Sequence, residues 1–353
     1  MEISDIDKNL KINTGLNLCD VKYYDAEDEP FKIFGVFREN DCFRRLPEKL
    51  SSSISPYIDW GAVHTAGGRV RFSTDSEYVA INAEMRNLSI MNHCAPTGSC
   101  GFDMFEKAEN AQKYLGTFLP TEELKTEPQG YENVIHLGSR KMRDIIINFP
   151  LYAGVKKLHI GLEDSATVTK GGEYKYKKPV VYYGSSITQG GCASKPGSSY
   201  QAILSSHLDC DYINLGFSGN ALGEDCVAEY IAALNMSVFV YDYDHNAPDV
   251  EHLKNTHMRF FNIIREKNPN IPIIIMSRPK YYINETEEQR LKVIKETYDA
   301  AIASGDKNVY FIPGTELMDD YLADNGTVDG CHPTDSGFLS MARRIEPLLK
   351  SLL

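Results

Sequence analysis

The most constraining feature of the sequence is an alternation of apolar runs and amphipathic segments that begins at Pro179. The apolar runs predict strands, and the segments between them carry apolar residues at helical spacing. Nearly continuous apolar strands are typical of a parallel sheet that helices cover on both faces. The predicted strands are 179–184, 212–215, 237–242, 271–276 and 308–312, and the predicted helices are 200–208, 225–234, 250–267, 286–304 and 334–352.

Residues 1–170 show a different pattern, in which short runs alternate between apolar and polar residues. Examples are 78–82 and 157–162, and clusters of turn residues separate such runs. Many short strands with regular turns predict a β-sandwich of the jelly-roll type. The polar, glycine-containing segment 169–178 marks a junction. We therefore expect a sandwich domain at 1–170 and an α/β domain at 179–353.

Charge and composition restrict the partners of the chain. Its 353 residues carry a formal net charge of −12, whereas nucleic acids and anionic membranes require a basic face. No apolar run reaches the roughly 18 residues that span a bilayer. Residues 1–13 lack the basic and apolar regions of a secretory signal. We therefore expect a cytoplasmic protein whose eight cysteines are reduced.

Polar turns, three of which contain glycine, follow four of the five predicted strands. They are 184–188, 215–220, 242–248 and, after the fifth strand, 328–333. In an open parallel sheet, ligands bind beyond the carboxyl ends of the strands. We therefore expect the chemistry to follow the first, second, third and fifth strands.

The last of these turns contains Asp329 and His332, which are three residues apart. In one helical turn such a pair lies on one face, where the carboxylate can orient the imidazole and stabilise its protonated form. An imidazole held in this way can deprotonate a serine, and the first turn offers Ser185 and Ser186. Although α/β-hydrolases share this order of residues, the chain has no G-x-S-x-G sequence, which argues against that fold.

The four turns resemble the sequence blocks of the SGNH, or GDSL-type, hydrolase superfamily, in the same order and at similar spacing. The resemblance covers 179–353 and implies a three-layer αβα, flavodoxin-like domain with a five-stranded parallel sheet. It implies Ser186 as the nucleophile, His332 as the base and Asp329 as its partner. It also implies an oxyanion hole formed by the backbone N–H groups of Ser186 and Gly219 and the side-chain amide of Asn246.

Two positions depart from the pattern of this superfamily. Ser185 stands where the G-D-S motif has aspartate, and the position relative to Ile187 favours Ser186 as the nucleophile. In the third turn Asn246 is retained, but its neighbours differ from the G-x-N-D pattern. His245 lies in this turn and is a candidate substrate contact.

The first half of the chain resembles the β-sandwich domains that precede SGNH domains in bacterial carbohydrate acetylesterases. The resemblance rests on segments 71–76, 101–105 and 148–155, and such domains are similar to carbohydrate-binding modules. Aromatic faces can stack on sugar rings, and the chain holds 21 Tyr, 15 Phe and a single tryptophan, Trp60. Trp60 is therefore a second candidate substrate contact.

Together these features predict a serine esterase that removes acetyl groups from carbohydrate, with manno- or xylo-oligosaccharides from hemicellulose as the leading substrates. The short polar turns carry no apolar lid, which favours a small acyl group. Two alternatives remain, namely a lysophospholipase- or thioesterase-like acylhydrolase and a carbohydrate-binding protein without activity. We expect no metal and no cofactor, and we expect Cys192 and Cys331 to be bystanders. The sequence gives no oligomeric state.

Overall fold

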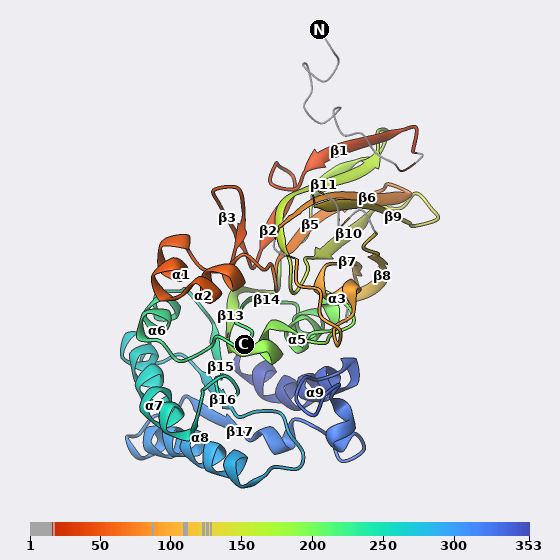
Figure 1. The fold of residues 1–353 in the computed structure, drawn as a ribbon. Coiled ribbons are helices and arrows are strands. Elements are labelled where there is room, and N and C mark those ends of the chain that lie inside the picture. Colours follow the sequence, from red (N-terminus) through yellow and green to blue (C-terminus); the bar gives the residue numbers. More distant parts are fainter. Residues whose placement is uncertain are drawn as a thin grey trace. The chain divides into compact units, whose positions relative to one another are not determined.

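Figure 1 shows the computed structural model, which describes residues 16, 18–86, 88–108, 112–121, 124, 127 and 129–353. The chain forms two compact units. The first contains residues up to 48, 62–173 and 195–197, and the second contains 49–61, 174–194 and 198–353. Residues 49–61 thus belong to the second unit, although the sequence pattern groups them with the first. Residues 1–13, in which we expect no secretory signal, lie outside the described residues.

The described part of the first unit contains two antiparallel sheets and a short hairpin. One sheet has the order β1 (Val21–Asp25), β11 (Gly154–Glu163), β6 (Tyr78–Arg86) and β9 (Gly130–His136). The other has the order β12 (Val168–Lys170), β5 (Arg69–Thr74), β10 (Arg143–Asn148), β7 (Phe102–Lys107) and β8 (Gln112–Phe118), and β2 (Lys32–Phe34) also pairs with β5. The hairpin consists of β3 (Phe37–Glu39) and β4 (Cys42–Arg44), and a short helix α3 (Pro96–Ser99) precedes β7.

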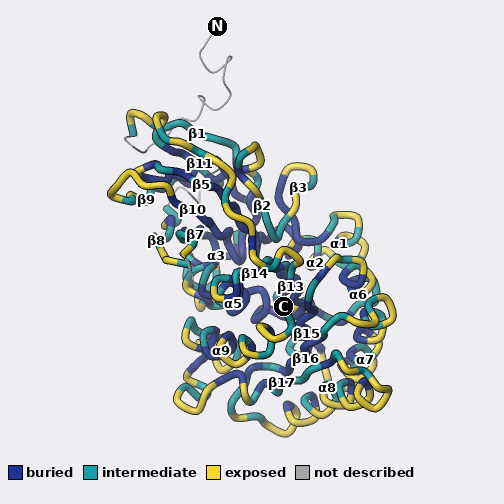
Figure 2. Tube along the Cα trace, turned by 180° about the vertical axis from the view of Figure 1, so that it is seen from behind, coloured by how far each residue is buried: buried dark blue, intermediate teal, exposed yellow. Residues whose placement is uncertain are grey.

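The two antiparallel sheets share one apolar core. Because side chains alternate along a strand, Val70 and Phe72 of β5 point to the same face and meet Ile145 and Ile147 of β10. Residues of the other sheet, such as Ile160 of β11, belong to the same buried cluster, which Figure 2 shows in dark blue. The predicted β-sandwich is confirmed, whereas its assignment to the jelly-roll type stays a prediction.

The second unit contains a five-stranded sheet in which every neighbouring pair is parallel. Its order is β14 (Cys210–Gly216), β13 (Tyr176–Gly184), β15 (Val238–Asp242), β16 (Ile273–Met276) and β17 (Val309–Ile312). This is the flavodoxin-like order, in which the first strand lies between the second and third. Every residue of β15 and β16 is buried, as a sheet covered on both faces requires. The predicted α/β fold is confirmed.

Helices form two layers against this sheet (Figure 1). Helix α5 (Tyr200–Leu208) packs with α9 (Asp335–Leu352), whereas α6 (Asp225–Ala232), α7 (Val250–Lys267) and α8 (Glu285–Ala303) pack in sequence. Helix α8 begins with a capping box, because Asn284 accepts from the Glu287 N–H and the Glu287 carboxylate accepts from the Asn284 N–H. All five predicted helices are present, with small differences at their ends.

The remaining elements of the described residues are short. They are helices α1 (Glu48–Ile54), α2 (Pro56–Ala62) and α4 (Ser186–Gln189) and the 3₁₀ turns η4 (Pro196–Ser198), η5 (Gly314–Glu316) and η6 (Ala323–Gly326). Within the part of the chain that the structure describes, no helix has the length and apolar content needed to cross a membrane. The eight cysteines all lie among the described residues, and none of them forms a disulfide.

Candidate active site

The end of β13 separates the roles of the two adjacent serines. Ser185 is the N-cap of α4, where its Oγ accepts a hydrogen bond of 3.1 Å from the Ile187 N–H. Ser186 is the first residue of the helix, and its Oγ lies 2.8 Å from Nε2 of His332. A Cβ on the preceding Gly184 would lie 2.2 Å from Thr188 Oγ1, so only glycine fits this tight entry to the helix.

Asp329 makes three hydrogen bonds within one loop, two of them to His332 and one to Cys331. Asp329 Oδ1 accepts from the backbone N–H of His332 (2.8 Å) and of Cys331 (3.0 Å), which forms a compact turn. Asp329 Oδ2 lies 2.8 Å from Nδ1 of the His332 ring. The carboxylate therefore accepts a hydrogen bond from Nδ1–H, which leaves Nε2 as the acceptor that faces Ser186.

The electrostatics of Asp329 suit a carboxylate that stays ionised. Partial burial raises its pKa, but the hydrogen bonds from the backbone and ring of His332 outweigh burial and bring the pKa down to about 2. A carboxylate that stays charged is able to stabilise an imidazolium at His332.

The turn after β14 is fixed by the helix that carries Ser186. Gly184 and Gly216 are neighbours in the sheet, so the segments after them leave the same edge. Gln189, the last residue of α4, accepts a 3.0 Å hydrogen bond from the Ser218 N–H through its Oε1. Gly219 comes next, is exposed and has φ of +72°, a left-handed conformation that favours glycine. Its backbone amide is thereby held next to the Ser186 helix.

Asn246 lies in the loop after β15, which a buried arginine clamps on both sides. Asp242, the last residue of β15, is the sheet neighbour of Gly184. Arg290 of α8 donates from Nη1 to the Asp244 carbonyl (2.8 Å) and from Nη2 to the Ala247 carbonyl (2.6 Å). Asn246 is half-buried between these two fixed carbonyls, and its Oδ1 has no hydrogen-bond partner among the described residues.

A buried carboxyl group, that of Asp242, anchors helix α4, which begins with Ser186. Asp242 Oδ2 accepts from Thr188 Oγ1 (2.8 Å) and from the Tyr200 hydroxyl (3.2 Å). Burial raises the pKa of Asp242 to about 7, against these two hydrogen bonds, which lower it. Asp242 therefore ties α4 to β15 and α5 without contacting the Ser186 hydroxyl.

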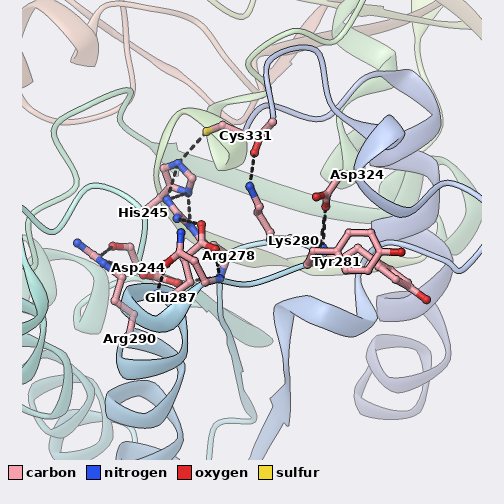
Figure 3. Close-up of polar contacts among 12 residues, drawn as sticks. Asp244, His245, Arg278, Lys280, Tyr281, Glu287, Arg290, Asp324 and Cys331 are labelled. Carbon is pink, nitrogen blue, oxygen red and sulfur yellow. Dashed lines mark hydrogen bonds and ion pairs between the residues drawn. The ribbon is translucent and has the colours of Figure 1, made fainter.

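The two candidate substrate contacts have different surroundings. Trp60 is 45% exposed on α2. A Cβ on the adjacent Gly61 would lie 3.6 Å from the Phe217 ring, which places α2 beside the turn that carries Gly219. His245, in contrast, has protein groups at both ring nitrogens. Arg278 Nε lies 3.1 Å from its Nδ1, and Cys331 Sγ lies 2.7 Å from its Nε2 (Figure 3).

The loop formed by residues 328–333, called the acid–base loop below, contains three potential metal ligands. One ligand atom each of Asp329, Cys331 and His332 lie within 4.8 Å of one another. Both ring nitrogens of His332, however, already have partners in Asp329 and Ser186. A metal would have to displace one of these contacts, so the arrangement suits proton transfer better than metal binding.

Sequence reasoning missed the contribution of the fourth strand. Arg278 follows β16 by two residues, and its backbone N–H donates to Asp244 Oδ2 (3.0 Å). The segment after β16 is not among the four turns that resemble the sequence blocks of the superfamily. Arg290 lies within helix α8. One sequence signal for Arg290 is its place among the apolar positions of a predicted helix. A buried arginine requires fixed hydrogen-bond or ion-pair partners, so such a position indicates a polar network.

Two family models match the chain. The model of the GDSL-like lipase/acylhydrolase family matches residues 177–350. The model of the N-terminus of SGNH hydrolase-type esterases matches residues 21–168. A comparison with curated proteins gives no match.

Several solved structures have the same fold over nearly the whole chain. A Bacteroides ovatus protein classed as a GDSL-like lipase is 27% identical, with a TM-score of 0.84 over 94% of this chain and 98% of its own. The salicylyl-acyltransferase SsfX3 from a tetracycline biosynthetic pathway is 17% identical, with a TM-score of 0.74 over 95% and 98%. An acetyl xylan esterase from the rumen bacterium Butyrivibrio proteoclasticus is 12% identical, with a TM-score of 0.57 over 94% and 98%.

The second and third of these likenesses concern the fold alone. The two family models between them match parts of both units of the chain. The GDSL-like lipase/acylhydrolase model matches the second unit, and the model of the esterase N-terminus matches mainly the first. The chain therefore belongs to the SGNH/GDSL family of hydrolases.

Proposed function

We propose that this protein is a serine esterase that removes acetyl groups from carbohydrates, with acetylated manno- or xylo-oligosaccharides as its substrates. One observation carries the proposal, namely the continuous chain from Ser186 Oγ to His332 Nε2 (2.8 Å) and from His332 Nδ1 to Asp329 (2.8 Å). These are the distances at which an imidazole can accept the proton of a serine hydroxyl while a carboxylate stabilises the resulting charge.

In the first step His332 Nε2 accepts the Ser186 proton while Ser186 Oγ attacks the carbonyl carbon of the acetyl ester. The carbonyl π electrons move onto the oxygen, whose negative charge the backbone amides of Ser186 and Gly219 and the amide of Asn246 stabilise. The intermediate collapses by breaking the bond to the sugar oxygen, and that oxygen takes the proton from His332. An acetyl-enzyme on Ser186 remains.

In the second step water replaces the sugar alcohol. His332 removes a proton from the water, whose oxygen attacks the acetyl carbonyl carbon. When the second intermediate collapses, the bond to Ser186 Oγ breaks and the serine recovers its proton from His332. Acetate leaves and the enzyme returns to its starting state.

The exposed side chains of the second unit favour a sugar as the alcohol. Its strongly exposed large apolar residues are mostly aromatic: of six, four are Tyr57, Trp60, Tyr282 and Tyr321, and only Ile302 and Val328 are aliphatic. Aromatic faces stack on sugar rings, and their polar groups bind hydroxyls, whereas a long acyl chain requires a continuous aliphatic surface. An acetyl xylan esterase shares this fold, so the fold itself is compatible with such a substrate.

Acetate release from acetylated xylo- and manno-oligosaccharides tests the proposal. We expect release from at least one of them, and p-nitrophenyl acetate to be hydrolysed faster than the butyrate and octanoate esters. Rates that rise with chain length would favour the lysophospholipase- or thioesterase-like alternative. Glycan binding without turnover would favour the inactive binding protein.

Trp60 gives a second test, specific to the sugar. Trp60→Ala should raise KM for the oligosaccharide and leave p-nitrophenyl acetate hydrolysis unchanged. Tyr57→Ala is the matched control, because Tyr57 lies on the same helix α2 and is 71% exposed. Equal effects of the two substitutions would argue against a sugar platform at Trp60.

A further inference from the structure

A direct side-chain contact joins the two loops that carry the proposed oxyanion donor and the proposed base. Cys331 Sγ lies 2.7 Å from His245 Nε2, although 86 residues separate them in the chain (Figure 3). His245 directly precedes Asn246, and Cys331 directly precedes His332. Because neighbouring residues share a planar peptide, a displacement of either contacting residue moves the adjacent functional residue.

The His245 ring is supported on the side opposite Cys331. Arg278 donates from Nε to His245 Nδ1 (3.1 Å), and its Nη2 lies 2.9 Å from both ring nitrogens. Arg278 is itself held by an ion pair of 2.5 Å with Glu287, which is buried at the start of α8. Figure 3 shows this series of contacts running from Cys331 through His245 to α8. The ring is therefore fixed by the scaffold rather than by its own loop.

The backbone of the same loop is fixed separately. Arg290 binds the carbonyls of Asp244 and Ala247, and Asp244 Oδ2 accepts from the Arg278 N–H. The loop is thus anchored before and after Asn246, and His245 is the residue between these anchors that extends toward the other loop. The acid–base loop has its own tie at Gly330, whose carbonyl accepts from Lys280 Nζ at 3.1 Å.

The contact can be a hydrogen bond in either direction. Burial, with the charge of Arg278, lowers the pKa of His245 to about 3, so the ring is neutral. Arg278 Nε donates to Nδ1, whereas its Nη2 lies 2.9 Å from Nδ1 and from Nε2 alike. The thiol of Cys331 can donate as well as accept, so it can pair with Nε2 in either tautomer of the ring. Serine at position 331 can do the same, whereas alanine cannot.

We propose that the contact between His245 and Cys331 is a positioning device, which holds Asn246 and His332 in the relative geometry that the reaction needs. This inference rests on the proposed esterase function. The transition state requires the oxyanion donor and the base at once, whereas ground-state binding of a small ester does not. Loss of the contact should therefore lower kcat and leave KM nearly unchanged.

A double-mutant cycle on the full-length protein tests this proposal, with p-nitrophenyl acetate as substrate. Cys331→Ala and His245→Ala should each lower kcat about tenfold, in the range that a small misplacement of reacting groups produces. The double variant should lose no more than either single variant, because both remove the same contact. Cys331→Ser should retain kcat within about twofold of the wild type, because it keeps the acceptor. Cys226→Ala, a cysteine on α6 outside these loops, is the matched control.

Several results would overturn the proposal. The first is an unchanged kcat in Cys331→Ala. The second is a double variant whose loss in log kcat equals the sum of the two single losses. The third is a change in KM without a change in kcat. Melting temperatures identify a variant that has lost its fold, and Arg278→Gln then serves as the second variant, with the same expected fall in kcat. Wild type and Ser186→Ala in the same assay separate the two hypotheses. No wild-type activity overturns the proposed function and this inference together, whereas normal activity of the loop variants overturns only the inference.

Discussion

Ser186 Oγ and His332 Nε2 lie 2.8 Å apart, although 146 residues separate them in the chain. The serine lies at the carboxyl end of the interior strand β13, and the histidine lies in the loop between β17 and α9. A parallel sheet brings such segments together because all its strands end at one edge. The contact thus depends on the whole second unit rather than on local sequence.

Replacing Asp329 should show how much the orientation of His332 matters. Asp329→Asn keeps the shape of the side chain but removes the charge that stabilises the imidazolium. We expect kcat to fall about 10²- to 10⁴-fold with little change in KM, as for other triads of this kind. Steady-state kinetics of this variant beside Asp320→Asn, an exposed carboxylate outside the site, measure the effect. Equal rates for the two variants would show that Asp329 does not act on His332.

Removing the Asn246 amide should affect the transition state rather than binding. Loss of one oxyanion donor costs about 10²- to 10³-fold in kcat, so we expect Asn246→Ala to fall in this range at nearly constant KM. Asn246→Asp should be at least as impaired, since a carboxylate repels the developing negative charge. An unchanged kcat in Asn246→Ala would remove Asn246 from the oxyanion hole.

The buried Asp242 predicts a specific pH dependence of stability. Its pKa is about 7 in the folded protein and about 3.9 when unfolded, so the unfolded state releases the proton first as pH rises. The stability that the protonated group contributes is therefore full below about pH 4 and is lost as pH rises toward 7. Asp242→Asn lacks this titration and retains an acceptor for Thr188 and Tyr200.

Denaturant unfolding of wild type and Asp242→Asn at several pH values measures this difference. The free energy of unfolding of the wild type should decline relative to that of the variant between pH 4 and 7. Parallel curves for the two proteins would contradict a raised pKa at Asp242. Other buried carboxyl groups titrate in both proteins and cancel in the comparison.

The second unit could be predicted closely from the sequence because its strands are continuous apolar runs between polar turns. Helix α4 could not be predicted, because its four residues, which begin with Ser186, are too few to show a periodic pattern. Residues 49–61 gave no sign of belonging to the second unit, because membership of a unit is decided by long-range packing. Short helices such as α1 and α2 carry too little pattern to show it.

The candidate site, too, could be predicted only in part from the sequence. Ser186, Gly219, Asn246, Asp329 and His332 follow strand ends, and a topological rule therefore placed them together. The network of His245, Arg278 and Cys331 could not be predicted, because it depends on side-chain directions in three separate loops. From the sequence, Cys331 was expected to have no role in the reaction. Its contact with His245 could not be predicted, because no rule of sequence spacing relates the two residues.

The most direct test of the account compares Ser186→Ala with Ser185→Ala in the hydrolysis of p-nitrophenyl acetate. Ser186→Ala should lose essentially all turnover above the uncatalysed rate, because it removes the nucleophile. Ser185→Ala removes only the N-cap of α4 and should retain activity, with stability lowered by about 1 kcal/mol. A Ser186→Ala variant with near-normal turnover, or activity lost only in Ser185→Ala, would contradict the assignment of Ser186 as the nucleophile.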